Sequence, residues 1–346
     1  MTVKTDISAL IASRIARAWP GTTLAAEPTP LAGGFWASMY RLRLEGQPDG
    51  VPSEVVFRIA PDADMGAKEL AVQRTVAEMG FATPRVRLAG PADDELGGSW
   101  SVMDFAAGVP PLGDLNGIAA LRRAPALFAR MPKQLAAAMA ALHALDPEPV
   151  SGAVVEASPT VAWRVEQLLE HFEAGAEVLG RSDLVVAVRL LAQRRPREGT
   201  TVICHGDLHP FNLLVDADCD VTVIDWTAAI RAEPAYDVAF TSMLLGNPPL
   251  DAPGPFGAAI HWLGGRLAGR FVNRYRTIAP GNDLGAFDWY RALHGTRILI
   301  EAASLEAKHG PGAGGHPFGA LIPAATKALT AITGATITAP NILHAD

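Results

Sequence analysis

Short apolar runs of strand-like composition dominate the first hundred residues. The runs at 31–44 and 53–60 are β-rich, and the turn-forming segment EGQPDGVP joins them. A helical stretch, GAKELAVQRTVAEMG, occupies 66–80. The run RVRLAG, a polar turn and the strand SWSVMDF at 99–105 follow. This pattern predicts four or five short strands, with one helix inserted after the third.

From about residue 115 onward, apolar positions recur three and four apart, which is the spacing of amphipathic helices. Two short β-like runs, NLLVD and VTVID, interrupt the helical pattern once. Helices are predicted again after Asp237, over 258–275, 288–308 and 320–333. We therefore expect an α+β fold of two lobes, in which a mixed antiparallel β-sheet lobe with one inserted helix precedes a larger, mainly helical lobe.

The predicted boundary between the lobes gives an N-terminal lobe over 1–105 and a C-terminal lobe over 106–346. The chain begins with MTVKTDISALIASRIARAWPG, where Ser13, Arg14 and Arg17 interrupt the apolar positions. That segment predicts an amphipathic helix rather than a secretory signal. The apolar run LAAAMAALHAL is too short to span a bilayer.

Composition narrows the class of protein. The 346 residues are 49% hydrophobic and 19% charged, with a formal net charge of −7 and no basic arm. Such a balance gives a nucleic-acid partner no electrostatic support. Cys204 and Cys219 make neither a disulfide scaffold nor a metal cluster. We expect a cytoplasmic enzyme or binding protein, a monomer or homodimer, that binds no nucleic acid and no membrane.

The segment CHGDLHPFNLLVDADCDVTVIDW, residues 204–226, carries the candidate chemistry. Asp207 and Asn212 have the D-L-x-P-x-N spacing of a kinase catalytic loop, and Asp225 lies 13 positions after Asn212. Phosphoryl transfer needs a carboxylate near the attacking hydroxyl and oxygen ligands for Mg²⁺. An Asp and an Asn in a turn are most often turn-formers. The double motif favours chemistry, with a hairpin bringing the two oxygen ligands together.

At this point the chain resembles the aminoglycoside-phosphotransferase and choline-kinase-like branch of the protein-kinase-like fold. The segment HGDLHPFNLLVD…VTVIDWTAAIRAEPAYDVAF (205–240) is similar to that family throughout. Gly206 stands where protein kinases have Arg, and Trp226 follows the candidate metal-binding Asp, as in that branch. MAALHALDP (139–147) resembles the helix that precedes the catalytic loop. The resemblance is strongest from about 135 to 240.

The resemblance implies a role for each matching residue. Asp207 would be the catalytic base or hydroxyl-orienting carboxylate, and Asn212 and Asp225 would be the Mg²⁺ ligands. His205 would hold the loop backbone by a hydrogen bond, and Asp237 would tie the loop to the following helix. The family's co-substrate is a nucleoside triphosphate, here ATP or GTP.

The first lobe should supply the nucleotide site. In AGGFWASMY, a turn that contains Gly33, Gly34 and Ser38 could direct backbone amides at phosphate, although Gly pairs also mark ordinary hairpins. Arg58 stands where protein kinases have Lys, and Glu69 is its predicted ion-pair partner.

Three further residue predictions follow from local context. Lys68 should point to a different helix face from Glu69 and be solvated. His143, in an apolar helix, should be a satisfied core histidine, and Cys204 should be buried and inert.

The segment VMDFAAG at 102–108 resembles the hinge between the two lobes. In that hinge, the backbone around Asp104 and Phe105 would meet the edge of the nucleotide base.

The acceptor should bind to the helices at 245–346. Residues 238–346 contain six carboxylates and eight cations, whereas a polycationic aminoglycoside should meet clustered carboxylates. We therefore expect a neutral or partly apolar hydroxyl acceptor, such as a natural product or antibiotic. The alternatives are a metabolic kinase for an amino alcohol or sugar, of the choline- or fructosamine-kinase type, and a nucleotide-binding pseudokinase. The pseudokinase would lack at least one of Asp207, Asn212 and Asp225.

Overall fold

The computed structural model describes residues 7–31, 37–93, 95–111, 117–248, 255–312, 315–316 and 319–344. The chain divides into two compact units. The first unit comprises Met1–Pro110, Glu148–Val161 and Leu213–Ala228. The second comprises Pro111–Pro147, Ala162–Asn212 and Ala229–Asp346.

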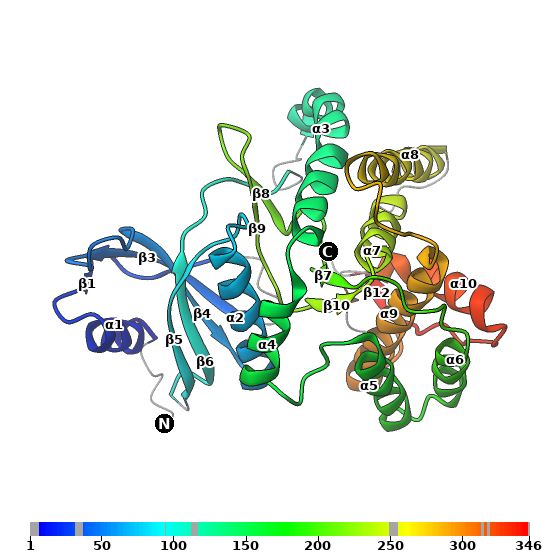
Figure 1. Ribbon diagram of the computed structural model, residues 1–346, viewed down its shortest axis with the longest axis horizontal. Helices are drawn as coiled ribbons and strands as arrows, with labels where there is room; N and C mark the ends of the chain where they lie inside the picture. The colour runs from blue at the N-terminus through cyan, green and yellow to red at the C-terminus, as the bar shows by residue number, and fades with distance from the viewer. Residues whose placement is uncertain are drawn as a thin grey trace. The chain divides into compact units, whose positions relative to one another are not determined.

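An antiparallel sheet forms the body of the first unit (Figure 1). Its strands are β1 (Thr23–Leu24), β2 (Thr29–Pro30), β3 (Ser38–Glu45), β4 (Glu54–Ala60), β5 (Val86–Asp93) and β6 (Gly98–Asp104). The order is β1–β3–β4–β6–β5, and β2 also pairs with β3. Because the two short strands β1 and β2 come first, the inserted helix follows the fourth strand of the chain and not the third.

That helix, α2 (Ala63–Glu78), has defined signals at both ends. The carboxylate of Asp62 accepts the N–H of Met65 at 2.9 Å, which caps the helix N-terminus. Beyond its last turn, Gly80 adopts a left-handed φ of 87° that suits glycine. The helix starts three residues before the predicted range because the cap lies upstream of the apolar pattern.

Strand β4 is buried along its length because a helix covers each face of the sheet. Phe57 and Ile59 belong to a core completed by Ile15 of α1 (Ile7–Ala18). Successive residues of a strand face opposite sides, so Arg58 faces the other side. There α2 packs against β4, β5 and β6. Figure 1 shows the two helices on either side of the strands.

A hairpin from later in the sequence completes the first unit. Its strands are β8 (Leu213–Val215) and β9 (Val221–Val223). The N–H of Val223 donates to the carbonyl of Ala82 (2.9 Å), and the indole N–H of Trp226 donates to the Thr83 hydroxyl (2.9 Å). The predicted hairpin is therefore present, and its bonds attach it to the segment between α2 and β5. Most of α4 (Pro147–Ala157) also belongs to this unit.

The second unit is mainly helical. Its helices are α3 (Gly117–His143), α5 (Val165–Val178), α6 (Ser182–Gln193), α7 (Ala235–Gly246), α8 (Pro255–Ile278), α9 (Phe287–His309), the 3₁₀ turn η1 (Gly319–Leu321) and α10 (Ile322–Thr333). Helix α8 packs against α3 and α7, and α9 packs against α7 and α10. Helix α7 is buried on almost every side, which its apolar composition all round requires.

Two strand pairs accompany these helices. Strands β7 (Val202–Cys204) and β10 (Ile230–Ala232) pair antiparallel, with Ile230 opposite Cys204. Strands β11 (Gly315–His316) and β12 (Leu343–His344) form a second, parallel pair. The first pair places Cys204, which immediately precedes the loop at 205–212, beside β10, the strand that comes before α7 in the chain.

In the described part of the chain, no helix combines the length and hydropathy that crossing a bilayer needs. The predicted helices at 258–275, 288–308 and 320–333 correspond to α8, α9 and α10. The division into a nucleotide-binding lobe over 1–105 and a second lobe over 106–346 stays a prediction.

The core of the first unit predicts the effect of a cavity. Val102 is fully buried against α1 and the sheet, whereas Val178, at the end of α5, is 88% exposed. We expect Val102→Ala to lower the free energy of unfolding by about 2 kcal/mol, since buried methyl groups are lost and a cavity is left. Val178→Ala should change it by less than about 0.5 kcal/mol. Denaturant unfolding of both variants checks this, and equal effects would contradict the packing described.

Candidate active site

The loop 205–212 follows β7 in the second unit and is held by its backbone. At the start of α7, the Asp237 carboxylate accepts the N–H of His205 on Oδ2 (2.8 Å) and that of Gly206 on Oδ1 (2.7 Å). The Thr241 hydroxyl, one turn further along α7, donates to the carbonyl of Leu208 (2.6 Å). Helix α7 thus fixes the path of the loop, as the sequence predicted for Asp237.

A chain of buried hydrogen bonds supports that carboxylate. The side-chain amide of Asn282 donates to the Tyr275 hydroxyl (2.6 Å), which lies 2.6 Å from Nδ1 of His143. Nε2 of His143 lies 3.1 Å from Oδ2 of Asp237. Donation can run along this chain from Asn282 to Asp237, with a proton on Nε2 of His143 facing the carboxylate. His143 is therefore a satisfied core histidine, as expected.

Ionisation of Asp237 depends on these donors. Burial alone would raise the pKa of Asp237, but the hydrogen bonds from His143 and from the Gly206 N–H hold that pKa below its ordinary value. The carboxylate is thus charged at neutral pH, and its charge is matched by donors on both oxygens.

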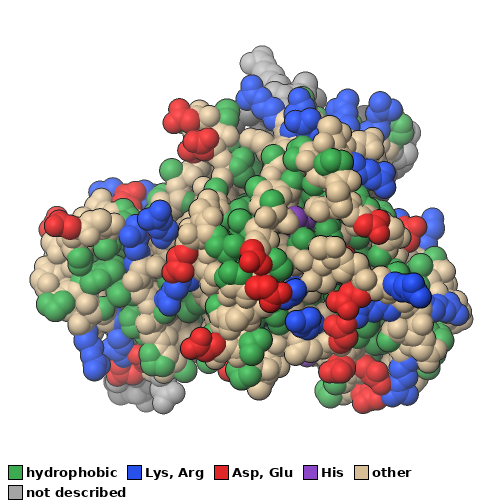
Figure 2. Space-filling model, viewed as in Figure 1, with side chains coloured by type: hydrophobic (Ala, Val, Ile, Leu, Met, Phe, Trp, Pro, Cys, Tyr) green, Lys and Arg blue, Asp and Glu red, His purple; other side chains and the backbone are tan. Residues whose placement is uncertain are grey.

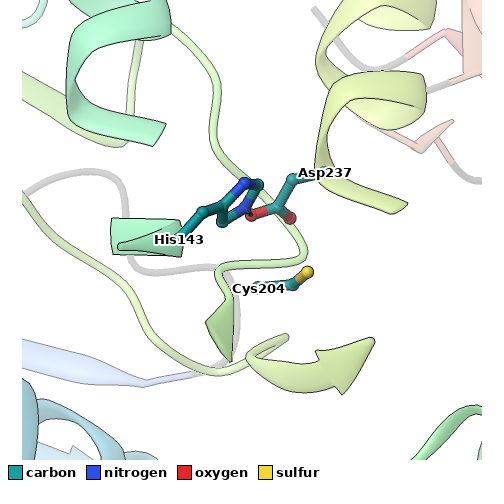
Figure 3. Close-up of side chains that lie close together, drawn as sticks. All are labelled: His143, Cys204 and Asp237. Carbon is teal, nitrogen blue, oxygen red and sulfur yellow. Dashed lines mark hydrogen bonds and ion pairs between the residues drawn. The ribbon is translucent and has the colours of Figure 1, made fainter. Parts of the chain in front are cut away.

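His143, Cys204 and Asp237 lie close together (Figure 3), and one potential ligand atom of each falls within 4.8 Å of the others. Both nitrogens of His143 and both oxygens of Asp237 already have hydrogen-bond partners. Burial raises the pKa of the Cys204 thiol well above its ordinary value, and Asp237 adds to the effect. A cysteine binds a metal as its thiolate, and the other ligand atoms are engaged, so this cluster is a structural network rather than an ion site.

Asp207 is the carboxylate that the loop presents. Its Oδ1 accepts from Nη2 of Arg297, on α9, at 3.2 Å. Its Oδ2 accepts from the side-chain amide of Asn212 at 3.1 Å and lies 3.4 Å from Nε2 of His209. The Asp207 N–H lies 3.3 Å from Nδ1 of His205, so His205 does contact the loop backbone as predicted.

These neighbours keep Asp207 ionised. Burial opposes ionisation, but the positive potential of His209 and of Arg297 lowers the pKa of Asp207 to about 2. His294, one turn before Arg297 on α9, donates to the carbonyl of Tyr236 (2.9 Å). Burial and the charge of Arg297 lower the pKa of His294 to about 3, so this ring stays neutral beside the cation.

Asn212 ends the loop with its donors turned inward. Its amide nitrogen also donates to the backbone carbonyl of Asp207 (2.9 Å), and the residue is 8% exposed. Among the residues that the structure describes, none donates to its Oδ1. That oxygen is therefore open to a ligand, which is what a role in metal binding requires.

In the first unit, Arg58 and Glu69 form the predicted ion pair, with Nη2 and Oε2 2.6 Å apart and both side chains buried. Burial raises the pKa of Glu69 to about 7, the charge of Arg58 opposes that rise, and the charge of Asp225 adds to it. The role of this pair in nucleotide binding stays a prediction.

Asp225 follows β9 with a left-handed φ of 67°. The Thr227 hydroxyl lies 2.6 Å from Oδ1 of Asp225 and 3.3 Å from Oε2 of Glu69. The Thr227 N–H also approaches that Oδ1, at 3.3 Å. Among the described side chains, none donates to Oδ2 of Asp225, so this oxygen is available to a cation.

Lys68 is buried, contrary to the prediction that it is solvated. The residue is only 4% exposed, and burial lowers its pKa to about 8. The buried face of α2 includes Gly66, Glu69, Gln73 and Val76, and it extends to Lys68 and Val72. The prediction of a solvated Lys68 was wrong because the face of α2 that packs is wider than the apolar stripe in the sequence.

The other residues predicted for the nucleotide site are Gly33, Gly34, Ser38, Asp104 and Phe105. Gly33 and Gly34 lie outside the described residues, and Ser38 is the exposed first residue of β3. The Asp104 carboxylate is bound by both Nε and Nη2 of Arg87 (2.7 and 2.9 Å).

The backbone of the predicted hinge is partly engaged as well. The N–H groups of Asp104 and Phe105 donate to the carbonyls of Arg85 (3.0 Å) and Glu54 (3.3 Å). Neither N–H is free for a base edge.

Sequence reasoning missed Arg297, Thr227 and His209. Thr227 and His209 lie inside the motif itself, so their polar side chains could have been included. Arg297 lies 90 residues after Asp207, on a helix with no motif, and is one of eight cations in its region. No local pattern distinguishes it from the others.

Comparison with protein families decides the class. A model of the phosphotransferase enzyme family matches residues 27–280, well over half of the chain. The chain belongs to this family. The matched region contains every predicted site residue from Gly33 to Asp237. Arg297 lies beyond it. A comparison with curated proteins gave no match.

Solved structures show the same fold. A Ralstonia eutropha JMP134 protein named as an aminoglycoside phosphotransferase is 18% identical, with a TM-score of 0.66 over 96% of this chain and 99% of the other. A thermostable mutant of aminoglycoside phosphotransferase APH(4)-Ia, in a ternary complex with AMP-PNP and hygromycin B, is 15% identical, with a TM-score of 0.60 over 94% and 97%.

Macrolide 2'-phosphotransferase from Brachybacterium faecium is 16% identical, with a TM-score of 0.53 over 95% and 99%. These likenesses confirm the predicted protein-kinase-like fold class.

The hydrogen bonds of Asp237 predict a large cost for removing its charge. Asp237→Asn should lower the free energy of unfolding by about 2–3 kcal/mol, because an amide cannot accept on both sides and a buried N–H is left unsatisfied. Asp183→Asn, at a partly exposed pair with Arg181 (2.8 Å), should cost about 1 kcal/mol or less. Because the pKa of Asp237 is lowered on folding, its contribution is complete above about pH 4 and is lost as pH falls further.

Denaturant unfolding of both variants between pH 3 and 7 checks this. Equal costs for the two variants would contradict the role of Asp237.

Proposed function

We propose that this chain is a Mg²⁺-dependent small-molecule kinase that transfers the γ-phosphoryl group of ATP or GTP to a hydroxyl of a small molecule. One observation carries the proposal: the loop of a phosphotransferase-family chain presents an ionised Asp207 whose carboxylate is bound on both oxygens. The crystallised relatives named with AMP-PNP or with GDP support a nucleotide co-substrate.

Asp207 would orient the acceptor hydroxyl for in-line attack. The hydroxyl oxygen forms a bond to the γ-phosphorus, and the bond from that phosphorus to the bridging oxygen breaks, which releases the nucleoside diphosphate. The hydroxyl proton passes to the Asp207 carboxylate. Phosphoryl transfer has a loose transition state, so positioning and charge stabilisation supply most of the catalysis.

The donor set fits Mg²⁺. Oδ1 of Asn212 and the Asp225 carboxylate are hard oxygen ligands, and the hydrogen bonds described above leave Oδ1 of Asn212 and Oδ2 of Asp225 open. Asn212 and Asp225 would hold the ion, which would supply positive charge to the nucleotide phosphates. Thr227 would orient the Asp225 carboxylate.

The nucleotide would be bound by the first unit. Arg58, held by Glu69, would offer its guanidinium to phosphate, and Gly33, Gly34 and Ser38 would supply the phosphate-binding turn. The base would meet the carbonyls of Asp104 and Phe105 or the N–H of Ala106, since the N–H groups of the first two are engaged in the sheet.

The acceptor would bind between α7, α8 and α9. A pocket of about 520 Å³ there is lined by Met243, Asn247, Asn273, Arg276, Phe287 and Arg291, among others, with no carboxylate among the lining residues. In Figure 2, Lys and Arg side chains gather over α3 and α8, and neither helix contains an acidic residue. A neutral or partly apolar acceptor, such as a natural product or antibiotic, would suit a pocket without carboxylates better than a polycation would.

The role of Asp207 is tested by an isosteric change. Asp207→Asn should lower turnover by about 10³-fold or more, because the amide cannot receive the hydroxyl proton, while nucleotide affinity stays within about twofold. Transfer rates and nucleotide titration calorimetry measure the two quantities. Unchanged turnover would refute the assignment.

The acceptor class is tested by a phosphorylation screen. Alcohols that are cationic, neutral or apolar are incubated with Mg²⁺ and ATP or GTP, and products are detected by a mass increase. Neutral and partly apolar alcohols should be phosphorylated in preference to polyamines, because the pocket presents cations. A screen in which only polyamine aminoglycosides react would reverse this conclusion.

A further inference from the structure

Arg297 makes two contacts that span one peptide of the loop. Nη1 donates to the carbonyl oxygen of Gly206 (3.1 Å), and Nη2 donates to Oδ1 of Asp207 (3.2 Å). The guanidinium thus binds the backbone just before Asp207 and the Asp207 side chain together. These contacts fix the carboxylate relative to its own main chain.

The guanidinium is itself held from other sides. Its central carbon lies 4.4 Å from the centroid of the Phe240 ring, on α7, and Nε lies 3.8 Å from Oε1 of Glu301, one turn along α9. The Arg297 side chain is only 12% exposed. Stacking and the buried position leave the fork few other orientations.

The second oxygen of Asp207 has different partners. Asn212 and His209 lie on Oδ2, whereas Arg297 lies on Oδ1. Rotation of the carboxylate about its Cβ–Cγ bond would break contacts on both sides. Each oxygen therefore has an assigned place, which is the condition for presenting one lone pair in a constant direction.

Helix α9 is anchored where Arg297 leaves it. Tyr290 and His294, on the preceding two turns, pack their rings against Tyr236 at centroid distances of 5.6 and 4.2 Å. His294 also donates to the Tyr236 carbonyl. Tyr236 immediately precedes Asp237. Helix α9 and the loop are therefore both bound to the N-terminal end of α7.

We propose that Arg297 is a positioning residue for phosphoryl transfer, which acts through Asp207 by fixing the direction of its carboxylate. This inference rests on the proposed function of Asp207. Arginine suits the task because its planar fork binds the Gly206 carbonyl and the carboxylate at once, whereas a lysine ammonium is a point charge. Arg297 touches neither reacting oxygen in this role.

A double-mutant cycle separates this role from a purely structural one. Arg297→Gln should lower kcat about 10- to 100-fold, because a carboxylate displaced by about 1 Å orients the hydroxyl poorly, and the KM for nucleotide should stay within about twofold. Arg297→Lys should recover part of the loss. In the Asp207→Asn background, Arg297→Gln should have no further effect, since the group it positions is gone.

Rates are measured as nucleotide hydrolysis, with water as acceptor, under single-turnover conditions so that slow variants remain measurable. Arg189→Gln, which breaks an exposed pair with Glu173 on α5, is the matched control and should keep the wild-type rate. Thermal unfolding of every variant reports folding. If Arg297→Gln does not fold, Arg297→Lys carries the same cycle.

Two results would overturn the inference. One is an equal loss from the Arg297 substitution in the wild-type and Asp207→Asn backgrounds, and the other is a raised nucleotide KM with unchanged kcat. Wild-type turnover in Asp207→Asn alone would instead refute the proposed function. A fall of about 10³-fold in Asp207→Asn, with additive Arg297 effects on the remaining rate, would leave the proposed function in place and remove only the role of Arg297.

Discussion

The carboxylate of Asp237 is the constraint on which the candidate catalytic loop depends. It accepts two consecutive backbone N–H groups, from His205 and Gly206, and thereby sets the direction in which the chain leaves β7. Through His143 and Tyr275 the same carboxylate is linked to the end of α3 and to α8. The loop thus takes its shape from contacts with three helices. Without this acceptor the two N–H groups would be buried and unsatisfied, which is costly.

Local patterns predicted what local forces decide. The β-rich runs that contain β3 and β4, the hairpin, and the spacing of Asp207, Asn212 and Asp225 were all readable because each depends on neighbours in sequence. The Arg58–Glu69 pair was predicted through the family resemblance. The burial of Lys68 and the contact of Arg297 were not predictable, because both depend on which surfaces pack together. Residue spacing carries no information about a partner 90 positions away.

Two ion pairs at the candidate site stand where apolar packing could have been. Arg58 with Glu69 in the first unit, and Arg297 with Asp207 in the second, are ion pairs removed from most of the solvent. Desolvation offsets much of the attraction in such pairs, and apolar replacements are often at least as stable. Stability therefore does not account for them. Each pair instead keeps a charged group in one orientation, as the proposed binding of phosphate and of a hydroxyl would require.

Gly206 adopts a φ of 77°, a conformation that side-chain-bearing residues rarely take. The arginine beside Asp207 comes instead from α9, far along the chain. Chains are synthesised from the N-terminus and fold as they emerge, so the whole motif leaves the ribosome well before Arg297. A nascent or truncated chain that ends before α9 would contain every residue of the sequence motif yet lack one of the contacts on Asp207. The loop acquires the contacts described here only after α9 has been made.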